Sequence, residues 1–440
     1  MKGLSGKIIV PGDFHYEQAR QEWNEAISKF PCIIVYCFTT YDVVKAILWS
    51  RRQGMKLRIR SGGHNYEGYS TGTGKLVIDT SCMNHIHVNC EQDTVEVQAG
   101  VRLTHLYETL YRYGYVFPGG TCPSVAISGL VMGGGIGLST RYLGLTTDSL
   151  IEVNMVDAWG NNIKANNHCN SDLFWALRGA GGGNFGVVTS YKFQLQRAVN
   201  KITLIQLEWH DNKPARLEFL RVWQTWLKHL DSRISAFGGI YKRGAWLNSF
   251  FYGHPEEAKQ LIEPFLNIPG ITLRRIEYVD FIDAVQRIGD EYPDREAFQS
   301  TGRFIKGCLS QEQLDTLVDI TDHAPTDANS YISVYSLGGA VGEKDENDTA
   351  FFYRNADYIM GISSNWELAK EAPVHKQWVA AALRYIYPFS VGSYINFPYH
   401  DLPDYERAYF GEHVQQLRCI KQQYDPHNVF AFPQSIKTLG

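Results

Sequence analysis

The sequence lacks any run of about 20 apolar residues, which is the length that a helix needs to cross a membrane. It also lacks a strong charge imbalance, because 42 Lys and Arg stand against 46 Asp and Glu and the formal net charge is −4. No basic run stands out, so nucleic acid and anionic membranes are poor candidates as partners. The first apolar run is too short for a signal peptide, so we expect a cytoplasmic protein. A secreted chain whose leader has been removed is the alternative.

The sequence also lacks a cysteine or histidine pattern that is typical of a disulfide framework or a metal site. The eight cysteines are scattered along the chain, and a protein of this size needs no disulfide framework, so we expect reduced thiols. His85, His87 and Cys90 could face one way on a strand. A zinc site needs three or four ligands at recognised spacings, however, and no further ligand is evident. We therefore predict no metal site.

The length of 440 residues predicts two domains rather than one hydrophobic core. Up to about residue 195, strand and helix patterns alternate with more glycine than packing alone requires. Beyond Lys201, glycine becomes rarer, helix patterns lengthen, and strand patterns lie between them. This mixture predicts an α+β fold. Helices are predicted over residues 39–54, 103–114, 215–230, 255–267, 310–321 and 372–387, and later strands over 202–209, 233–241, 330–339 and 358–366.

The glycines of the first part are clustered, and the clusters indicate a dinucleotide. They are Gly62 and Gly63, Gly119 and Gly120, Gly129 with Gly133 to Gly135, and Gly179 with Gly181 to Gly183. Backbone amides without covering side chains can approach an anion such as a pyrophosphate closely. The GGGNFG segment has the spacing of a nicotinamide-dinucleotide fingerprint, but a helix precedes it and a strand follows it, so a Rossmann site is excluded.

Two nucleophilic side chains lie directly beside these clusters. His64 follows the glycine pair in RSGGHNYEG, and Cys122 follows the next pair in PGGTCPSV. Each alone has an ordinary interpretation, as a hydrogen-bonded imidazole or as a small buried thiol. Beside an oxidised flavin, however, an imidazole nitrogen can attack the 8α carbon and a thiolate can attack C6. The pair therefore favours a flavin among the dinucleotides.

Five segments together resemble the berberine bridge enzyme-like flavoprotein oxidases, within the vanillyl-alcohol oxidase group of PCMH-type FAD-binding proteins. They are RSGGHNYEG, GGTCPSVAISGLVMGGGIG, DLFWALRGAGGGNFGVV, SYINFP and YDPHNVFAFPQSI, and they cover residues 60 to 436. The resemblance implies FAD bound covalently through His64 and Cys122. It also implies an FAD-binding domain of residues 1–198, to which residues 415–440 return, and a substrate domain of residues 199–414 with an antiparallel sheet flanked by helices.

The resemblance also assigns roles to individual residues. Tyr394 is the first choice as catalytic base, Tyr66 is expected to orient the substrate, and Tyr353 and Tyr399 are lesser candidates. Val125 resembles a position that controls access of oxygen, where valine goes with oxidase behaviour. The remaining expected cofactor contacts are Arg60, Ser61, Gly62, Gly63, Asn65, Ser128, Gly129, Gly134, Val188 and Asn396.

The chain departs from the family at several positions, which leaves its substrate open. Members that close alkaloid rings carry a glutamate near the position matched by Gly361, and Tyr353 and Ile136 also differ from the plant pattern. We expect an FAD-dependent oxidase that transfers hydride from a sugar lactol or other alcohol to the flavin and reduces O2 to H2O2. A tailoring oxidase of secondary metabolism, a nicotinamide-using reductase and a non-catalytic flavin-fold protein are the alternatives. The sequence leaves the oligomeric state open.

Overall fold

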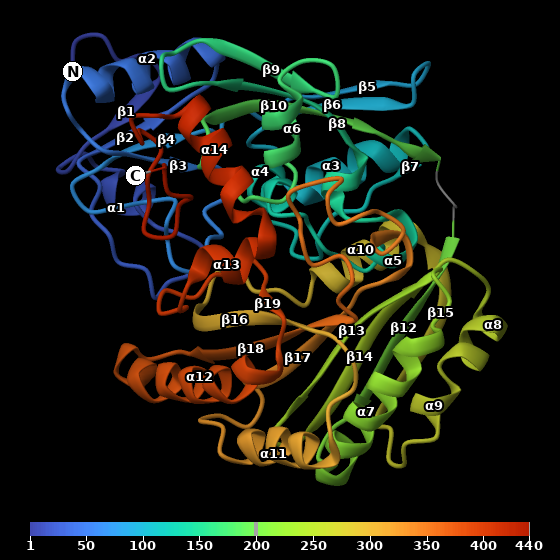
Figure 1. The fold of residues 1–440 in the computed structure, drawn as a ribbon. Helices are drawn as coiled ribbons and strands as arrows, with labels where there is room; N and C mark the ends of the chain where they lie inside the picture. Colours follow the sequence, from blue (N-terminus) through green and yellow to red (C-terminus); the bar gives the residue numbers. More distant parts are fainter. Residues whose placement is uncertain (198–200, 440) are drawn as a thin grey trace.

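The computed structural model describes residues 1–197 and 201–439, and these residues form four β-sheets with helices around them. Figure 1 shows the sheets of the first 197 residues in the upper part of the molecule and one large sheet in the lower part. The predicted boundary between residues 198 and 199 lies outside the described residues. Within those residues, no helix is both long and apolar enough to span a membrane.

The first sheet has the strand order β1-β2-β4-β3. Its strands are β1 (Lys7–Ile9), β2 (Ile33–Tyr36), β3 (Leu57–Arg60) and β4 (Leu76–Asp79). The short helix α1 (Tyr16–Ala19) follows β1, and α2 (Thr40–Arg52) connects β2 to β3. Thr39 accepts a hydrogen bond from the Asp42 amide and Asp42 binds the Thr39 amide in return, so a capping box fixes the predicted start of α2. The chain leaves β3 at the glycine pair that precedes His64.

The second sheet is antiparallel and has the order β5-β6-β10-β8-β9. Its strands are β5 (Ile86–Asn89), β6 (Thr94–Gln98), β8 (Leu150–Val156), β9 (Asn162–Asn166) and β10 (Val187–Gln194), and β7 (Tyr115–Val116) pairs separately with β11 (Gln196–Arg197). The helices of this part are α3 (Leu103–Arg112), α4 (Ile127–Met132), α5 (Thr140–Leu143) and α6 (Ser171–Ala176). The segment with Cys122 therefore lies between β7 and α4.

The largest sheet has eight antiparallel strands in the order β15-β12-β14-β13-β17-β18-β16-β19. They are β12 (Lys201–Trp209), β13 (Ile234–Tyr241), β14 (Gly244–Phe251), β15 (Leu273–Asp280), β16 (Ala297–Ile305), β17 (Ser330–Ser336), β18 (Tyr358–Trp366) and β19 (Gly392–Ser393). Helices α7 (Lys213–Trp226), α11 (Gln311–Asp322) and α12 (Ala372–Ile386) cover its outer face (Figure 1).

Alternation along the strands separates the two faces of this sheet. Ile332 and Val334 on β17 are fully buried in the cluster that the sheet forms with α7, α11 and α12. Since successive side chains of a strand point to opposite faces, Tyr331 and Tyr335 lie on the inner face. The inner face is directed toward the N-terminal sheets and carries aromatic and polar side chains.

The chain returns to its N-terminal part at the end, through α13 (Tyr405–Phe410) and α14 (Val414–Tyr424), as Figure 1 shows. Lys421 is completely buried and donates hydrogen bonds to the Asn184 and Phe430 carbonyls and to Asp425. Because a buried ammonium group needs several acceptors, this cluster fixes the last segment against the glycine-rich loop before β10.

The predicted α+β class with a helix-flanked antiparallel sheet is confirmed, and some element predictions need correction. The helix predicted over residues 255–267 is two helices, α8 (Pro255–Leu261) and α9 (Glu263–Leu266). Pro264 cannot donate a backbone hydrogen bond, so it begins a new helix instead of continuing the old one. Strands β14, β15 and β16 and helix α10 (Phe281–Gly289) were not among the predicted elements.

Candidate active site

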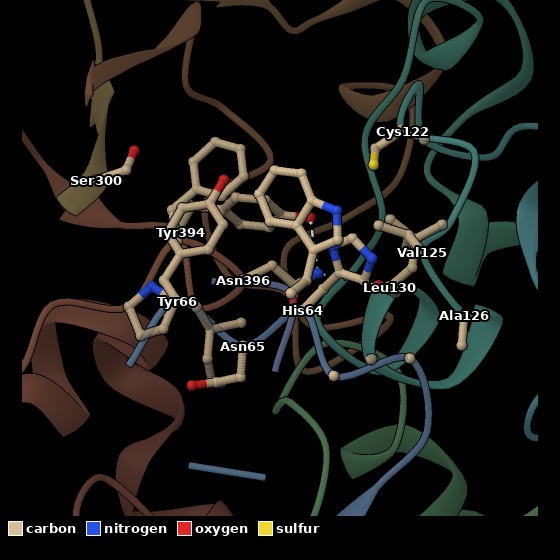
Figure 2. Close-up of a pocket in the computed structure, with 18 of the residues that line it drawn as sticks. His64, Asn65, Tyr66, Cys122, Val125, Ala126, Leu130, Ser300, Tyr394 and Asn396 are labelled. Carbon is tan, nitrogen blue, oxygen red and sulfur yellow. Dashed lines mark hydrogen bonds between the residues drawn. The ribbon is translucent and has the colours of Figure 1, made fainter. Parts of the chain in front are cut away.

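A cavity of about 790 Å³ lies between the N-terminal sheets and the inner face of the eight-stranded sheet. Figure 2 shows His64, Cys122 and Tyr394 around this cavity, although they come from distant parts of the chain. Glycine-rich backbone forms part of its wall, and aromatic and amide side chains of the sheet form another part. The cavity therefore offers both a surface for a phosphate-bearing group and a pocket for an organic substrate.

Close backbone packing brings the His64 and Cys122 segments together. A Cβ atom at Gly62 would lie 2.7 Å from the backbone nitrogen of Ala126, so only glycine allows the turn after β3 to touch the loop before α4. A Cβ atom at Gly129 would meet nothing within 4 Å, so the cavity is open beside that backbone. Gly62 therefore allows the two loops to pack against each other, and Gly129 leaves room for a bound group.

His64 is held on two sides. Its ring stacks on the indole of Trp23, with centroids 4.9 Å apart and planes inclined by 25°, and its Nε2 lies 3.1 Å from Oγ of Ser124. Burial and the charge of Arg102 lower the pKa of His64 to about 3. The imidazole is therefore neutral near pH 7, which is the nucleophilic form.

Cys122 is half-buried, and its Sγ lies 3.6 Å from the same Ser124 Oγ. Burial raises the pKa of the Cys122 thiol, and hydrogen bonding to Ser124 acts in the opposite direction. The two predicted nucleophiles thus share one neighbouring hydroxyl, at the edge of one cavity.

Tyr394 lies on the cavity wall with its hydroxyl held by two donors. The Gly135 amide and the Asn396 side-chain amide each donate to the Tyr394 hydroxyl at 3.1 Å. Burial nevertheless raises the pKa of Tyr394 to about 12. Tyr66 stacks on Phe397 nearby, with centroids 5.3 Å apart, and burial raises its pKa well above the ordinary value.

Most of the predicted site residues line this cavity. They are Ser61, Gly62, Gly63, His64, Asn65, Tyr66, Cys122, Val125, Ser128, Gly129, Tyr394 and Asn396. Their individual contacts with a cofactor remain predictions.

Three residues predicted as cofactor contacts do not line the cavity. Arg60 is buried in ion pairs with Asp79 and Glu22, because its guanidinium needs acceptors there. Gly134 packs against Phe351, where a Cβ would lie 2.7 Å from the ring. Val188 lies inside the hydrophobic core of the second sheet. Tyr353 and Tyr399, the lesser candidates for the base, are also absent from the cavity wall.

Several residues at or beside the cavity were not predicted from the sequence. Trp23 lines the cavity and stacks on His64, and Ser124 contacts His64 from beside the cavity wall. Neither residue lies in a glycine cluster. Glu296 lines the cavity in the segment before β16, where Asn365 donates a hydrogen bond to its carboxylate. Burial raises the pKa of Glu296 to about 7. A carboxyl group on this wall can therefore exchange protons near neutral pH.

The donor set of the cavity fits an FAD. Open glycine backbone suits the pyrophosphate, and a neutral imidazole and a thiol lie on the wall of the same cavity. Among residues 1–197 and 201–439, no group of three potential metal ligands is gathered.

Comparison with known proteins decides the family. The "FAD binding domain" family matches residues 31–166, and the "Berberine and berberine like" family matches residues 393–437. The chain is 34% identical to the uncharacterized FAD-linked oxidoreductase YgaK of Bacillus subtilis over 450 aligned positions, covering 99% of this chain and 98% of YgaK. The chain belongs to the berberine bridge enzyme-like FAD-linked oxidases.

This berberine bridge enzyme-like oxidase has further relatives with more specific names. It is 27% identical to the carbohydrate oxidase of Microdochium nivale, covering 98% of this chain and 93% of that protein. Its fold matches the structure of Physcomitrella patens BBE-like 1 with a TM-score of 0.94 at 28% identity, covering 100% of this chain and 98% of the other. The resemblance found in the sequence is therefore confirmed, and the protein is an FAD-binding oxidoreductase.

Proposed function

We propose that this oxidase converts the lactol end of a sugar or oligosaccharide to a lactone, with FAD attached covalently through both His64 and Cys122. The observation that carries the proposal is that both side chains line one cavity and both contact the Ser124 hydroxyl. A ring system in this cavity would meet two nucleophiles that come from distant parts of the chain. Two links would fix the ring while leaving the sheet side of the cavity free for a bulky substrate.

The sheet side of the cavity supports a sugar as the substrate. Trp246, Tyr331 and Tyr335 offer aromatic faces, and sugar rings stack on such faces. Asn248 and Asn329 offer amide groups that can pair with sugar hydroxyls. The name of the carbohydrate oxidase relative points to the same class of substrate. The segment around Gly361, near which ring-closing family members carry a glutamate, has no acid in this chain, which argues against alkaloid cyclisation.

The reaction needs one hydride acceptor and one base. FAD, when bound, accepts the hydride from the substrate carbon and passes the electron pair to O2, which yields H2O2. Tyr394 takes the proton of the substrate hydroxyl. The Gly135 amide and Asn396 donate hydrogen bonds to the Tyr394 oxygen, and such donors stabilise a phenolate. Tyr66 orients the substrate from the neighbouring wall.

The two parts of the chain divide this work. Residues 1–198 and 415–440 would hold the FAD, and residues 199–414 would hold the substrate. The cavity wall supports this division, because the glycine-rich segments come from the first part and the aromatic sheet face comes from the second.

Intact mass and colour test the proposal. The denatured chain should exceed its 50.0 kDa by one FAD. Either single variant, His64→Ala or Cys122→Ala, should retain that gain, and only the double variant should lose it. A panel of mono- and oligosaccharides should bleach the yellow protein without air, and air should restore the colour with release of H2O2. Bleaching only by non-sugar alcohols would favour a secondary-metabolite oxidase, and a colourless protein would contradict the proposal.

A further inference from the structure

Ser124 occupies the space between the two side chains proposed to hold the flavin. Its Oγ lies 3.1 Å from Nε2 of His64 and 3.6 Å from Sγ of Cys122. The backbone around it is fixed on both sides. The Val125 amide donates to the Cys122 carbonyl, the Val125 carbonyl accepts from Leu103, and Arg102 donates to the Ser124 carbonyl. The position of the hydroxyl is therefore set by the fold.

We propose that Ser124 is a positioning residue that prepares both His64 and Cys122 for covalent attachment of FAD. Its oxygen accepts the Nε2 proton of His64, and its own hydrogen is donated to the sulfur of Cys122. The inference rests on the proposed pair of covalent links and adds the residue that makes both nucleophiles reactive.

The contact with Ser124 selects one tautomer of His64. A neutral imidazole has one N–H group and one lone pair, and the hydrogen bond of one nitrogen decides the state of the other. When Nε2–H donates to Ser124, the lone pair remains on Nδ1, for which no hydrogen-bond partner is found among the described residues. Trp23 covers one face of the ring and opposes its rotation.

The same hydroxyl favours the thiolate of Cys122. Burial raises the pKa of the thiol, so the reactive anion is scarce at neutral pH. A hydrogen bond donated to sulfur stabilises the anion, and the Ser124 hydroxyl is the side chain placed to donate it. Accepting from His64 and donating to Cys122 are compatible, because a hydroxyl has one donor and two acceptor positions.

The bonds and electrons of both attachments balance. At His64 a bond would form between Nδ1 and the 8α carbon, one C–H bond of that carbon and the Nε2–H bond would break, and both protons would leave to solvent, the Nε2 proton by way of the Ser124 hydroxyl. At Cys122 an S–C bond forms, the S–H bond and one C–H bond at C6 break, and the two protons leave to solvent. Each attachment would release two protons and one electron pair, and O2 would take up that pair together with two protons to become H2O2.

Incorporation of FAD into the flavin-free full-length chain tests the proposal. The fraction of chain that keeps FAD after denaturation is followed over time by intact mass. A Cys122→Ala background reports the histidine link alone, and a His64→Ala background reports the cysteine link alone. In each background Ser124→Ala should slow attachment about tenfold or more, since a hydrogen bond to the reacting group is lost.

Shape-matched variants separate the hydroxyl from packing. Ser124→Thr keeps the hydroxyl and should attach FAD near the rate of the parent. Ser124→Val has the shape of the threonine variant but lacks the hydroxyl, so it should behave like Ser124→Ala. Ser300→Ala removes a hydroxyl of the cavity wall on the sheet side, away from His64 and Cys122, and should leave attachment unchanged. Noncovalent FAD binding and thermal melting identify any variant that fails to fold, and the Thr and Val pair then decides.

The cysteine link offers a signature that packing alone does not give. Raising the pH from 7 to 9 should accelerate attachment more in Ser124→Ala than in the parent. A higher pH increases the thiolate fraction of Cys122, and the variant lacks the hydrogen bond that favours the thiolate at pH 7. Parental rates for Ser124→Ala in both backgrounds, or slowing in only one, would overturn the shared role of Ser124 and leave the proposed function intact. A parent chain without any covalent FAD would overturn both.

Discussion

The indole of Trp23 stacks on the imidazole of His64, with ring centroids 4.9 Å apart and planes inclined by 25°. The backbone amide of Trp23 also donates to the Gly63 carbonyl at 2.9 Å, so both the main chain and the side chain of Trp23 hold the turn that presents His64. The indole Nε1 is buried and finds no hydrogen-bond partner among the described residues. The contact therefore works through stacking rather than through a polar link.

Replacing Trp23 by alanine should slow attachment of FAD through His64. Aromatic stacking contributes about 0.5–1.5 kcal/mol beyond burial, and its loss lets the imidazole rotate away from Ser124. The measurement is the denaturation-stable FAD in a Cys122→Ala background, where only the histidine link can form. Trp23→Phe keeps an aromatic face and is the matched control. Equal attachment in the alanine and phenylalanine variants would contradict a stacking role.

Replacing Tyr394 by phenylalanine should lower the rate of flavin reduction by about 10²–10⁴-fold, because loss of a general base costs that much. Burial raises the pKa of Tyr394 to about 12, so the deprotonated fraction grows with pH. The wild-type rate of reduction should therefore climb from pH 6 to 10 without levelling off. Stopped-flow reduction without oxygen measures both effects. A variant that reduces its flavin at the wild-type rate and pH profile would remove Tyr394 from the proton transfer.

The strands show how far the sequence could predict the site. The alternating patterns of residues 330–339 and 358–366 correctly predicted β17 and β18. The alternating patterns could not show which face of each strand lines the cavity. Tyr331 lies on the cavity side and Ile332 on the helix side, and this difference arises only because helices cover one face of the sheet. β15 has a mixed burial pattern without clear alternation, which explains why its sequence gave no strand signal.

The glycine clusters pointed to the cofactor end of the cavity but not to its partners. His64 and Cys122 were found because they adjoin glycines that allow backbone contact. Trp23, Ser124 and Glu296 depend on contacts between segments far apart in the chain, and no local pattern marks such contacts. The ion pairs of Arg60 could not be predicted for the same reason, because its acceptors Asp79 and Glu22 lie outside its own motif.

Replacing Val125 by leucine should slow reoxidation of the reduced flavin by O2. Val125 lines the cavity close to Cys122, and a longer side chain there would fill space that oxygen must enter. A change of about tenfold corresponds to about 1.4 kcal/mol in the barrier. Reduction by substrate should stay near the wild-type rate, and Val125→Ala should keep fast reoxidation. Unchanged oxygen reactivity in the leucine variant would exclude Val125 as the control point.

Glu296 should make the stability of the protein depend on pH around neutrality. Burial raises its pKa from 4.5 to about 7, so the folded state holds a proton that the unfolded state has lost. The stabilisation from this proton is fully present below about pH 4.5 and disappears as the pH rises through 7. The neighbouring Cys122 and Tyr331 have pKa values raised above their ordinary ranges, and that of His64 is lowered to about 3, so none of them titrates near 7.

Glu296→Gln removes this titration and keeps a side chain that Asn365 can contact. The free energy of unfolding of the variant minus that of the wild type should increase by about 2 kcal/mol from pH 5 to pH 8. Urea unfolding of the flavin-loaded proteins at both pH values measures the difference. Glu208→Gln replaces an exposed carboxylate at the same cavity and is the matched control variant. A constant difference between Glu296→Gln and wild type across this range would contradict the raised pKa of Glu296 in the folded protein.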